Sequence, residues 1–149
     1  MTIKGGINHV TLRVQNLARS EAFYCGLLGL KRVGERRGMA FYSSGHYNHE
    51  LALMEDPAIT PQAIAQGGLM HIAFNVSDEA ALKALYQRMI EAGHPVSEGV
   101  DHVISHAFYT RDADGYTVEI TTDMPRETWE NNPSAFRHDK SMEIQTSNQ

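Results

Sequence analysis

The sequence predicts an α+β protein of two βαβββ repeats, whose curved mixed sheets form a half-barrel with the helices outside. Residues 9–16 and residues 71–78 align as two copies of a strand that runs into the start of a helix. Each copy continues as a helical segment that ends at a glycine, and three extended segments follow it. One helix covers only one face of its sheet, so we expect the two sheets to set their open faces around a cleft.

The first repeat is expected over about residues 5–55. Its opening strand, residues 8–14, alternates apolar and polar side chains, so that Val10, Leu12 and Val14 share one face. Asn16 suits a helix N-cap and Gly29 a left-handed C-cap, which predicts a helix over residues 17–28. The three strands after this helix are expected over residues 30–35, 39–43 and 49–54.

The second repeat is expected over about residues 69–122, with an opening strand over residues 70–76. Ser77 or Asp78 suits the N-cap of a helix over residues 78–92, and Gly93 ends it. The spacing of this segment gives one apolar helix face, made of Leu82, Leu85, Tyr86, Met89 and Ile90. The later strands are expected over residues 96–100, 104–111 and 116–122, with a hairpin turn at residues 112–115.

The remaining segments are expected to connect or to end the fold. Residues 55–68 contain Pro57, Pro61 and a Gly-Gly pair, and they are interpreted as the linker between the repeats. We predict one domain over residues 1–122 and a polar C-terminal tail over residues 123–149. Trp129 and Phe136 are expected to pin this tail to the body or to a partner subunit, while its last ten residues fray.

Composition limits the classes of function. The 149 residues suffice for one core, and a net charge of −5 argues against a nucleic-acid partner. A single cysteine, Cys25, excludes an intrachain disulfide and suits a reducing compartment. The sequence has no apolar run of the ~20 residues that a membrane span needs, and residues 1–6 lack the apolar core of a signal peptide. We therefore expect a cytoplasmic protein without a membrane partner.

Three potential metal ligands lie on the polar sides of otherwise apolar strands. They are His9, His71 and Glu119. A lone strand histidine is more often a hydrogen-bonded core residue, and a lone strand glutamate is usually solvated. Their matching positions in a repeat favour a shared site instead, and two histidines with one carboxylate form the set that binds Fe(II) while leaving positions open. The sequence thus predicts a divalent metal site.

The repeated βαβββ pattern with His9, His71 and the segment Asp-Gly-Tyr-Thr-Val-Glu119 resembles the vicinal oxygen chelate superfamily over residues 5–122. This superfamily includes glyoxalase I, fosfomycin-resistance thiol transferases, methylmalonyl-CoA epimerases and type I extradiol dioxygenases. The resemblance implies that His9, His71 and Glu119 bind a divalent metal. It also implies a homodimer, with swapped and unswapped assembly both open.

Three further residues resemble the type I extradiol dioxygenases in particular. His49 begins a His-acid-x-Ala-apolar strand, and His102 begins a His-x-x-Ser-His stretch. Tyr109 precedes Glu119 by ten residues, as the catalytic tyrosine of those enzymes precedes its glutamate ligand. The resemblance implies that His49, His102 and Tyr109 are catalytic, whereas His106 falls on the opposite face from Tyr109 and is expected to be structural. The turn reads Asp112-Ala113-Asp114-Gly115 where the family has Asp-Pro-Asp-Gly, and we expect no effect from that change.

The resulting expectation is an Fe(II)-dependent extradiol dioxygenase of one domain that cleaves the ring of a catechol-type aromatic diol with O2. Mn(II) is the alternative metal. A rival hypothesis is a glyoxalase I-like or epimerase-type enzyme, in which Glu50 serves as a fourth ligand to Ni(II) or Zn(II). Because neighbouring strand residues face opposite sides, only one of His49 and Glu50 can face the metal. A third hypothesis is a drug-binding resistance protein of the same fold.

Overall fold

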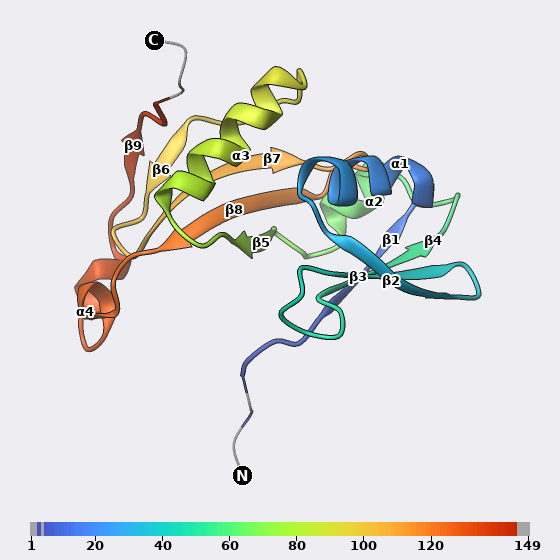
Figure 1. Cartoon of the computed structure of the whole chain (residues 1–149), viewed down its shortest axis with the longest axis horizontal. Coiled ribbons are helices and arrows are strands. Elements are labelled where there is room, and N and C mark those ends of the chain that lie inside the picture. The colour runs from blue at the N-terminus through green and yellow to red at the C-terminus, as the bar shows by residue number, and fades with distance from the viewer. Residues whose placement is uncertain (1–2, 4, 146–149) are drawn as a thin grey trace. The chain divides into compact units, whose positions relative to one another are not determined.

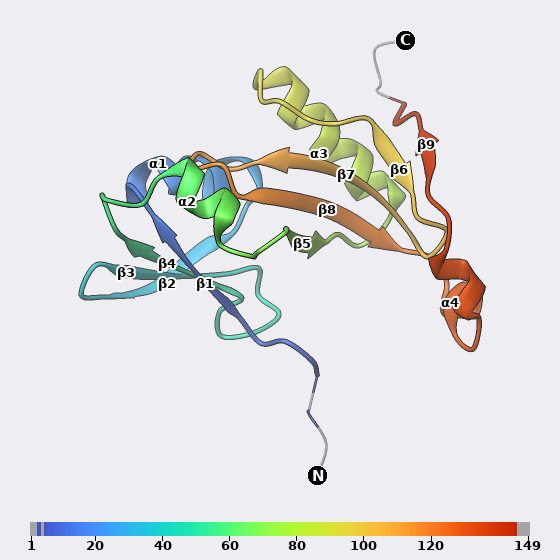
Figure 2. The same cartoon turned by 180° about the vertical axis from the view of Figure 1, so that it is seen from behind.

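The computed structural model describes residue 3 and residues 5–145 of the chain (Figures 1 and 2). The chain divides into two compact units. The first unit contains residues 1–68 together with the turn at residues 112–115, and the second contains residues 69–111 and 116–149. No helix in the described part of the chain has the length and apolar character needed to span a membrane.

The first unit is built on a four-stranded mixed sheet with the strand order β1-β4-β3-β2. Its strands are β1 (Val10–Val14), β2 (Lys31–Arg36), β3 (Met39–Ser43) and β4 (Leu51–Glu55). β1 runs parallel to β4, and the other pairs are antiparallel. Between β1 and β2 the chain forms α1 (Leu17–Glu21) and the π-helical η1 (Ala22–Leu27), and α2 (Pro61–Gln66) follows β4.

The local signals in the first repeat act as predicted. Leu12 and Val14 of β1 are buried while Thr11 and Arg13 are exposed. The side chain of Asn16 accepts a hydrogen bond from the backbone N–H of Arg19, which caps α1. Gly29 ends the helical segment with a φ of 82°, a conformation that costs glycine little because it has no Cβ.

The second unit repeats this topology in a five-stranded sheet of order β5-β8-β7-β6-β9. Its elements are β5 (Ile72–Asn75), α3 (Glu79–Glu91), β6 (Gly99–Asp101), β7 (Ser105–Arg111), β8 (Thr117–Asp123), α4 (Arg126–Trp129), the 3-10 turn η2 (Pro133–Phe136) and β9 (Lys140–Met142). β5 pairs in parallel with β8, as β1 pairs with β4. The same order in both sheets confirms the predicted pair of βαβββ repeats and the α+β class.

α3 lies along one face of the second sheet (Figure 1). The ring of Tyr86 on α3 packs edge-on against Phe108 of β7 at 5.0 Å, and His106 contacts Glu79 in the first turn of α3. Residues 106 and 108 of β7 therefore face the helix, and residues 107 and 109 face the opposite side, which we call the open face. On α3 itself, Leu82 and Met89 are buried, whereas Ile90, predicted on the apolar face, is 45% exposed.

The ends and connections contain structure that the sequence did not predict. The predicted linker contains α2, which Thr60 caps through the N–H of Ala63 and which begins at a proline. The last ten residues do not all fray, because β9 pairs with β6 and Ile144 is buried; residues 146–149 lie outside the described part. Trp129 is half-buried and donates its indole N–H to the carbonyl of Met124, whereas Phe136 is 61% exposed.

Candidate metal and acid–base site

Glu119 is the centre of a polar cluster in the second unit. It lies in the middle of β8, where its partners across the sheet are Tyr109 on β7 and Ala73 on β5. Tyr109 belongs to the open face of the sheet. Glu119 is only 7% exposed, and its Oε2 lies 3.0 Å from Nε2 of His71, which directly precedes β5. A buried carboxylate needs a cation or hydrogen-bond donors, and His71 and its neighbours provide that environment.

His102 and Tyr109 complete this cluster. Nε2 of His102 lies 3.1 Å from the Tyr109 hydroxyl and 3.8 Å from Oε1 of Glu119. The Tyr109 ring also meets the His71 ring edge-on, with 5.8 Å between the centroids. Burial is the main factor that raises the pKa of Tyr109 above its ordinary value, followed by the charge of Glu119 and a hydrogen bond to it. The phenol therefore stays protonated near neutral pH and acts as a hydrogen-bond donor.

A tight turn sets the position of His102. The N–H of His102 donates to the carbonyl of Ser105, and the N–H of Val103 donates to Oδ1 of Asp101 at 2.7 Å. Val103 has a φ of 69°, in the left-handed region where a β-branched residue is strained. Strain of this kind persists only where the surrounding structure holds it in place, and it is concentrated at functional sites.

His9 and His49 lie together in the first unit. Their rings are 4.3 Å apart, and the Phe41 ring meets His49 edge-on at 5.2 Å. The three side chains border a hollow of about 680 Å³, whose other lining residues are Thr11, Gly34, Glu35, Arg36 and Met39. The preceding asparagine binds each ring: Nδ1 of His9 is 2.9 Å from Oδ1 of Asn8, and Nδ1 of His49 is 2.6 Å from Oδ1 of Asn48. In neutral imidazole this contact leaves the lone pair on Nε2.

Glu50 is held within its own loop. Its carboxylate accepts hydrogen bonds from the N–H of Ser44, the hydroxyl of Ser44 and the N–H of Tyr47, each at 2.9 Å. Burial acts to raise the pKa of Glu50, but these hydrogen bonds together lower it below its ordinary value. Both carboxylate oxygens are thus used to close the loop over residues 44–47, while His49 packs beside His9.

The structure brings the six residues predicted for the site together in two groups. His71, Glu119, His102 and Tyr109 gather in the second unit, and His9 and His49 gather in the first. Within the part of the chain that the structure describes, no three or more His, Cys, Asp or Glu side chains form a set that could hold a metal ion. His106, expected to be structural, faces α3 and contacts Glu79 there.

Comparison with known protein families assigns the chain to a superfamily. The Glyoxalase/Bleomycin resistance protein/Dioxygenase superfamily matches residues 6–120, which include both repeats up to β8. The chain belongs to this superfamily. The match confirms the resemblance that the spacing of His9, His71 and Glu119 indicated.

Individual superfamily members differ in the chemistry that their names describe. The catechol-2,3-dioxygenase of Bacillus subtilis is 32% identical over 125 residues, which cover 83% of this chain and 44% of that protein. This chain therefore spans less than half the length of that relative. The metallothiol transferase FosB of Staphylococcus haemolyticus is 34% identical over 119 residues, covering 78% of this chain and 83% of the relative. A glyoxylase/bleomycin resistance protein/dioxygenase domain from Frankia sp. EAN1pec shares the fold, with a TM-score of 0.67 and 23% identity over 82% of this chain and 100% of that one.

Sequence reasoning missed the polar partners of the predicted site histidines. Asn8 and Asn48 each precede a site histidine, so the repeated Asn-His pair was a signal that could have found them. Asp139, which contacts His102 at 2.7 Å, had no such signal because it comes from the C-terminal tail.

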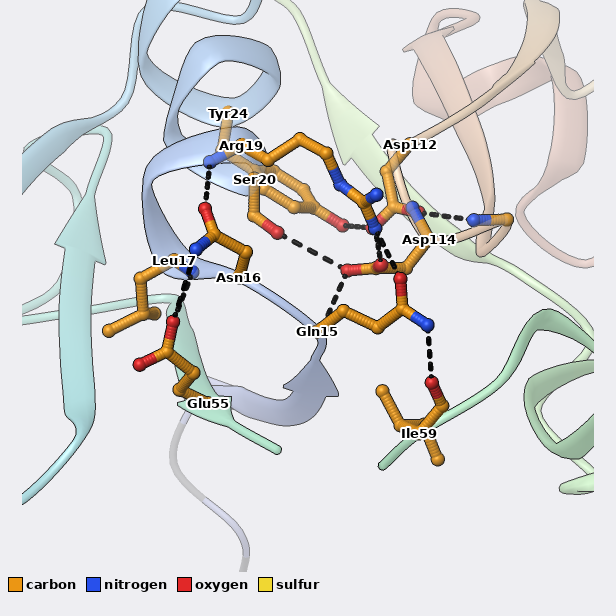
Figure 3. A network of polar contacts seen from close by, with 11 residues as sticks. Gln15, Asn16, Leu17, Arg19, Ser20, Tyr24, Glu55, Ile59, Asp112 and Asp114 are labelled. Atoms are coloured by element: carbon orange, nitrogen blue, oxygen red, sulfur yellow. Dashed lines mark hydrogen bonds and ion pairs between the residues drawn. The ribbon is translucent and has the colours of Figure 1, made fainter. Parts of the chain in front are cut away.

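The Asp112–Gly115 turn carries a second unexpected group, which is structural (Figure 3). The Tyr24 hydroxyl donates to Oδ2 of Asp112 at 2.8 Å. Asp114, whose side chain is 1% exposed, pairs with Arg19 and accepts hydrogen bonds from the Ser20 hydroxyl and the Gln15 N–H. The two aspartates hold the turn within the first unit, and Ala113, which replaces the proline of the family pattern, is exposed.

Proposed function

We propose that this chain is a metal-dependent extradiol dioxygenase that cleaves the ring of a catechol-type diol, with Fe(II) as the metal. The observation that carries the proposal is the His102–Tyr109 pair beside Glu119 and His71. A ring-cleaving enzyme must accept and return the protons of two vicinal hydroxyls, and a neutral imidazole hydrogen-bonded to a phenol is suited to that task. The 32% identity to a catechol-2,3-dioxygenase supports the same substrate class.

His71, Glu119 and His9 are the proposed metal ligands. His71 Nε2 and Glu119 Oε2 lie 3.0 Å apart, and the Glu119 side chain is buried, so a divalent ion bound here would meet an imidazole nitrogen and a carboxylate oxygen together. Nε2 of His9 carries the lone pair because Nδ1 contacts Asn8. This donor set suits an Fe(II) ion, because two imidazoles and a carboxylate bind Fe(II) and leave coordination positions for other ligands. When bound, such an ion would supply Lewis-acid activation of the diol and a path for electrons to O2.

The other proposed site residues move protons and bind the ring. Nε2 of His102 lies 3.1 Å from the Tyr109 hydroxyl, and as a neutral imidazole it would take up a proton from a diol hydroxyl. His49 is proposed as a second acid–base residue, since its Nδ1 contact with Asn48 leaves Nε2 as the basic nitrogen. The apolar side chains of Phe41 and Met39 beside it offer a surface on which an aromatic ring can pack.

The loop contacts of Glu50 argue against the rival four-ligand site. A glyoxalase-type assignment needs the Glu50 carboxylate at the metal, whereas here it accepts three hydrogen bonds from Ser44 and Tyr47. Releasing it would remove the acceptor of these three hydrogen bonds and open the loop over residues 44–47. His49, and not Glu50, is the neighbour of His9 in the first unit.

The proposal is tested by loading the protein with Fe(II) under anaerobic conditions and mixing it with a panel of catechols in oxygenated buffer. We expect a yellow ring-opened product and one O2 consumed per diol, with both oxygen atoms found in the product. The Fe(II)-loaded Glu119→Gln variant serves as the inactive control, and Mn(II), Ni(II) and Zn(II) are compared. No turnover on the whole panel, with formation of lactoylglutathione or a thiol adduct by the Ni(II) or Zn(II) form, would contradict the proposal.

A further inference from the structure

We propose that Asp139 is a positioning residue, which holds His102 in the tautomer that presents a lone pair to Tyr109. Oδ1 of Asp139 lies 2.7 Å from Nδ1 of His102, on the opposite side of the ring from the Tyr109 hydroxyl. Asp139 comes from the C-terminal tail, outside the two βαβββ repeats. The catalytic consequence of the contact between Asp139 and His102 rests on the proposed function, but the contact itself does not.

The register of the added strand sets this contact. β9 pairs antiparallel with β6, so that Gly99 lies opposite Met142, Val100 opposite Ser141 and Asp101 opposite Lys140. Continuing this register by one residue places Asp139 opposite His102. The side chains of directly opposed residues lie close enough to interact. The pairing of the two strands therefore delivers the carboxylate to the imidazole.

Gly99 permits this pairing. A Cβ at residue 99 would lie 2.6 Å from the carbonyl oxygen of Met142 and 2.7 Å from Cγ1 of Ile144, closer than real Cβ atoms approach. Ile144 is buried at 6% exposure, which anchors the tail beyond β9. The tail is thus held by a strand pair and an apolar contact, and Asp139 is held with it.

The chemistry of the pair fixes the proton on His102. A carboxylate only accepts hydrogen bonds, so Nδ1 must carry a proton to bind Asp139. In neutral imidazole the remaining nitrogen, Nε2, then has a lone pair, and it faces the Tyr109 hydroxyl at 3.1 Å. The other tautomer would direct an N–H at Tyr109 and could not accept a proton there. This is the role that a carboxylate plays toward histidine in hydrolytic triads.

The test reads the tautomer directly in the metal-free protein. Long-range ¹H–¹⁵N correlation spectra of ¹⁵N-histidine-labelled protein at mildly alkaline pH distinguish a protonated Nδ1 from a protonated Nε2. We expect His102 to be protonated at Nδ1 in the wild type and largely at Nε2 in Asp139→Ala. The matched control is Glu143→Ala, which removes the same charge from an exposed position in the same tail and should leave His102 unchanged.

A second variant removes the contact without changing Asp139. Gly99→Val should displace β9 and shift His102 toward the Nε2-protonated tautomer, while amide signals of β7 and β8 show that the sheet stays folded. If Asp139→Ala or Gly99→Val keeps His102 protonated at Nδ1 as in the wild type, the proposal is overturned.

Kinetics separate this proposal from the proposed function. With Fe(II) bound, Asp139→Ala should lose at least about 10-fold in kcat on a catechol with little change in KM, since a general base in the wrong tautomer cannot act. Unchanged kcat in Asp139→Ala would overturn the positioning role. If the wild type cleaves no catechol while the tautomer shifts as expected, the proposed function fails and the structural role of Asp139 stands.

Discussion

At the residue scale, oxygen acceptors beside the rings determine which nitrogen of each site histidine is basic. Asn8 serves His9, Asn48 serves His49 and Asp139 serves His102, in each case at Nδ1. An imidazole that is bound at Nδ1 has a fixed tautomer and a fixed ring orientation, which lowers the entropy lost when Nε2 meets a metal or a proton. Residues outside the proposed metal and substrate contacts thereby set the basic nitrogen of the histidines proposed to make those contacts.

Glu50 gives a prediction of pH-dependent stability at this scale. Because its pKa is lower in the folded protein than the ordinary value of 4.5, the ionised carboxylate favours the folded state. This stabilisation is complete above pH 4.5 and is lost as the pH falls through the lower folded pKa. Glu50→Gln should therefore unfold at lower urea concentration than the wild type at pH 7, and the difference should shrink below about pH 4.

Urea unfolding curves at the two pH values check this expectation, with Glu143→Gln as the control for loss of an exposed carboxylate in the tail. An equal difference between Glu50→Gln and the wild type at both pH values would show that the loop hydrogen bonds do not depend on the charge of Glu50.

At the element scale, the sequence predicted what depends on local pattern. The caps at Asn16 and Asp78 and the alternation in β1 are properties of neighbouring residues, and the structure has them as expected. Alternation also separated Tyr109 from His106 on β7, which led to the prediction of Tyr109 as a site residue and of His106 as a structural one. β9 could not be predicted, because its residues are polar and its pairing with β6 depends on the space beside Gly99 rather than on its own composition. Asp139 was missed for the same reason.

The turn between β7 and β8 supplies a prediction for a single element. Arg19 is the cationic partner of the buried Asp114, so Arg19→Met leaves a carboxylate with only hydrogen-bond donors around it. Because the Arg19 side chain is itself 47% exposed, we expect a loss of roughly 1–3 kcal/mol in the free energy of unfolding, below the cost of a fully buried pair.

Arg126→Met is the matched control for this variant, since Arg126 pairs with Glu130 on the surface and its loss should cost less than about 1 kcal/mol. Chemical denaturation measures both variants. Equal losses would mean that Asp114 does not depend on Arg19 for its charge compensation.

At the scale of the whole molecule, the two repeats share one topology but differ in what they provide. The first presents His9 and His49 beside a hollow that Phe41 and Met39 also line, and the second presents a buried carboxylate with His71, His102 and Tyr109. A duplicated βαβββ unit gives each copy an equivalent first strand, so both copies offer a histidine at the same position. The two repeats differ in their later strands. Tyr109 on β7 and Glu119 on β8 belong to the second repeat.

The proposed ligand set predicts how metal affinity responds to single substitutions in both units. His9→Ala, His71→Ala and Glu119→Gln should each weaken Fe(II) or Mn(II) binding by more than about 100-fold, the upper range for loss of an outer-shell partner. His49→Ala and Glu50→Gln should leave the affinity near that of the wild type, because His49 is assigned to proton transfer and Glu50 to its loop. Anaerobic calorimetric titration of the metal into each variant measures these constants, and circular dichroism verifies that each variant is folded. Loss of affinity in Glu50→Gln would favour the four-ligand, glyoxalase-type site, and an unchanged affinity in His9→Ala would assign the metal to residues of the second unit.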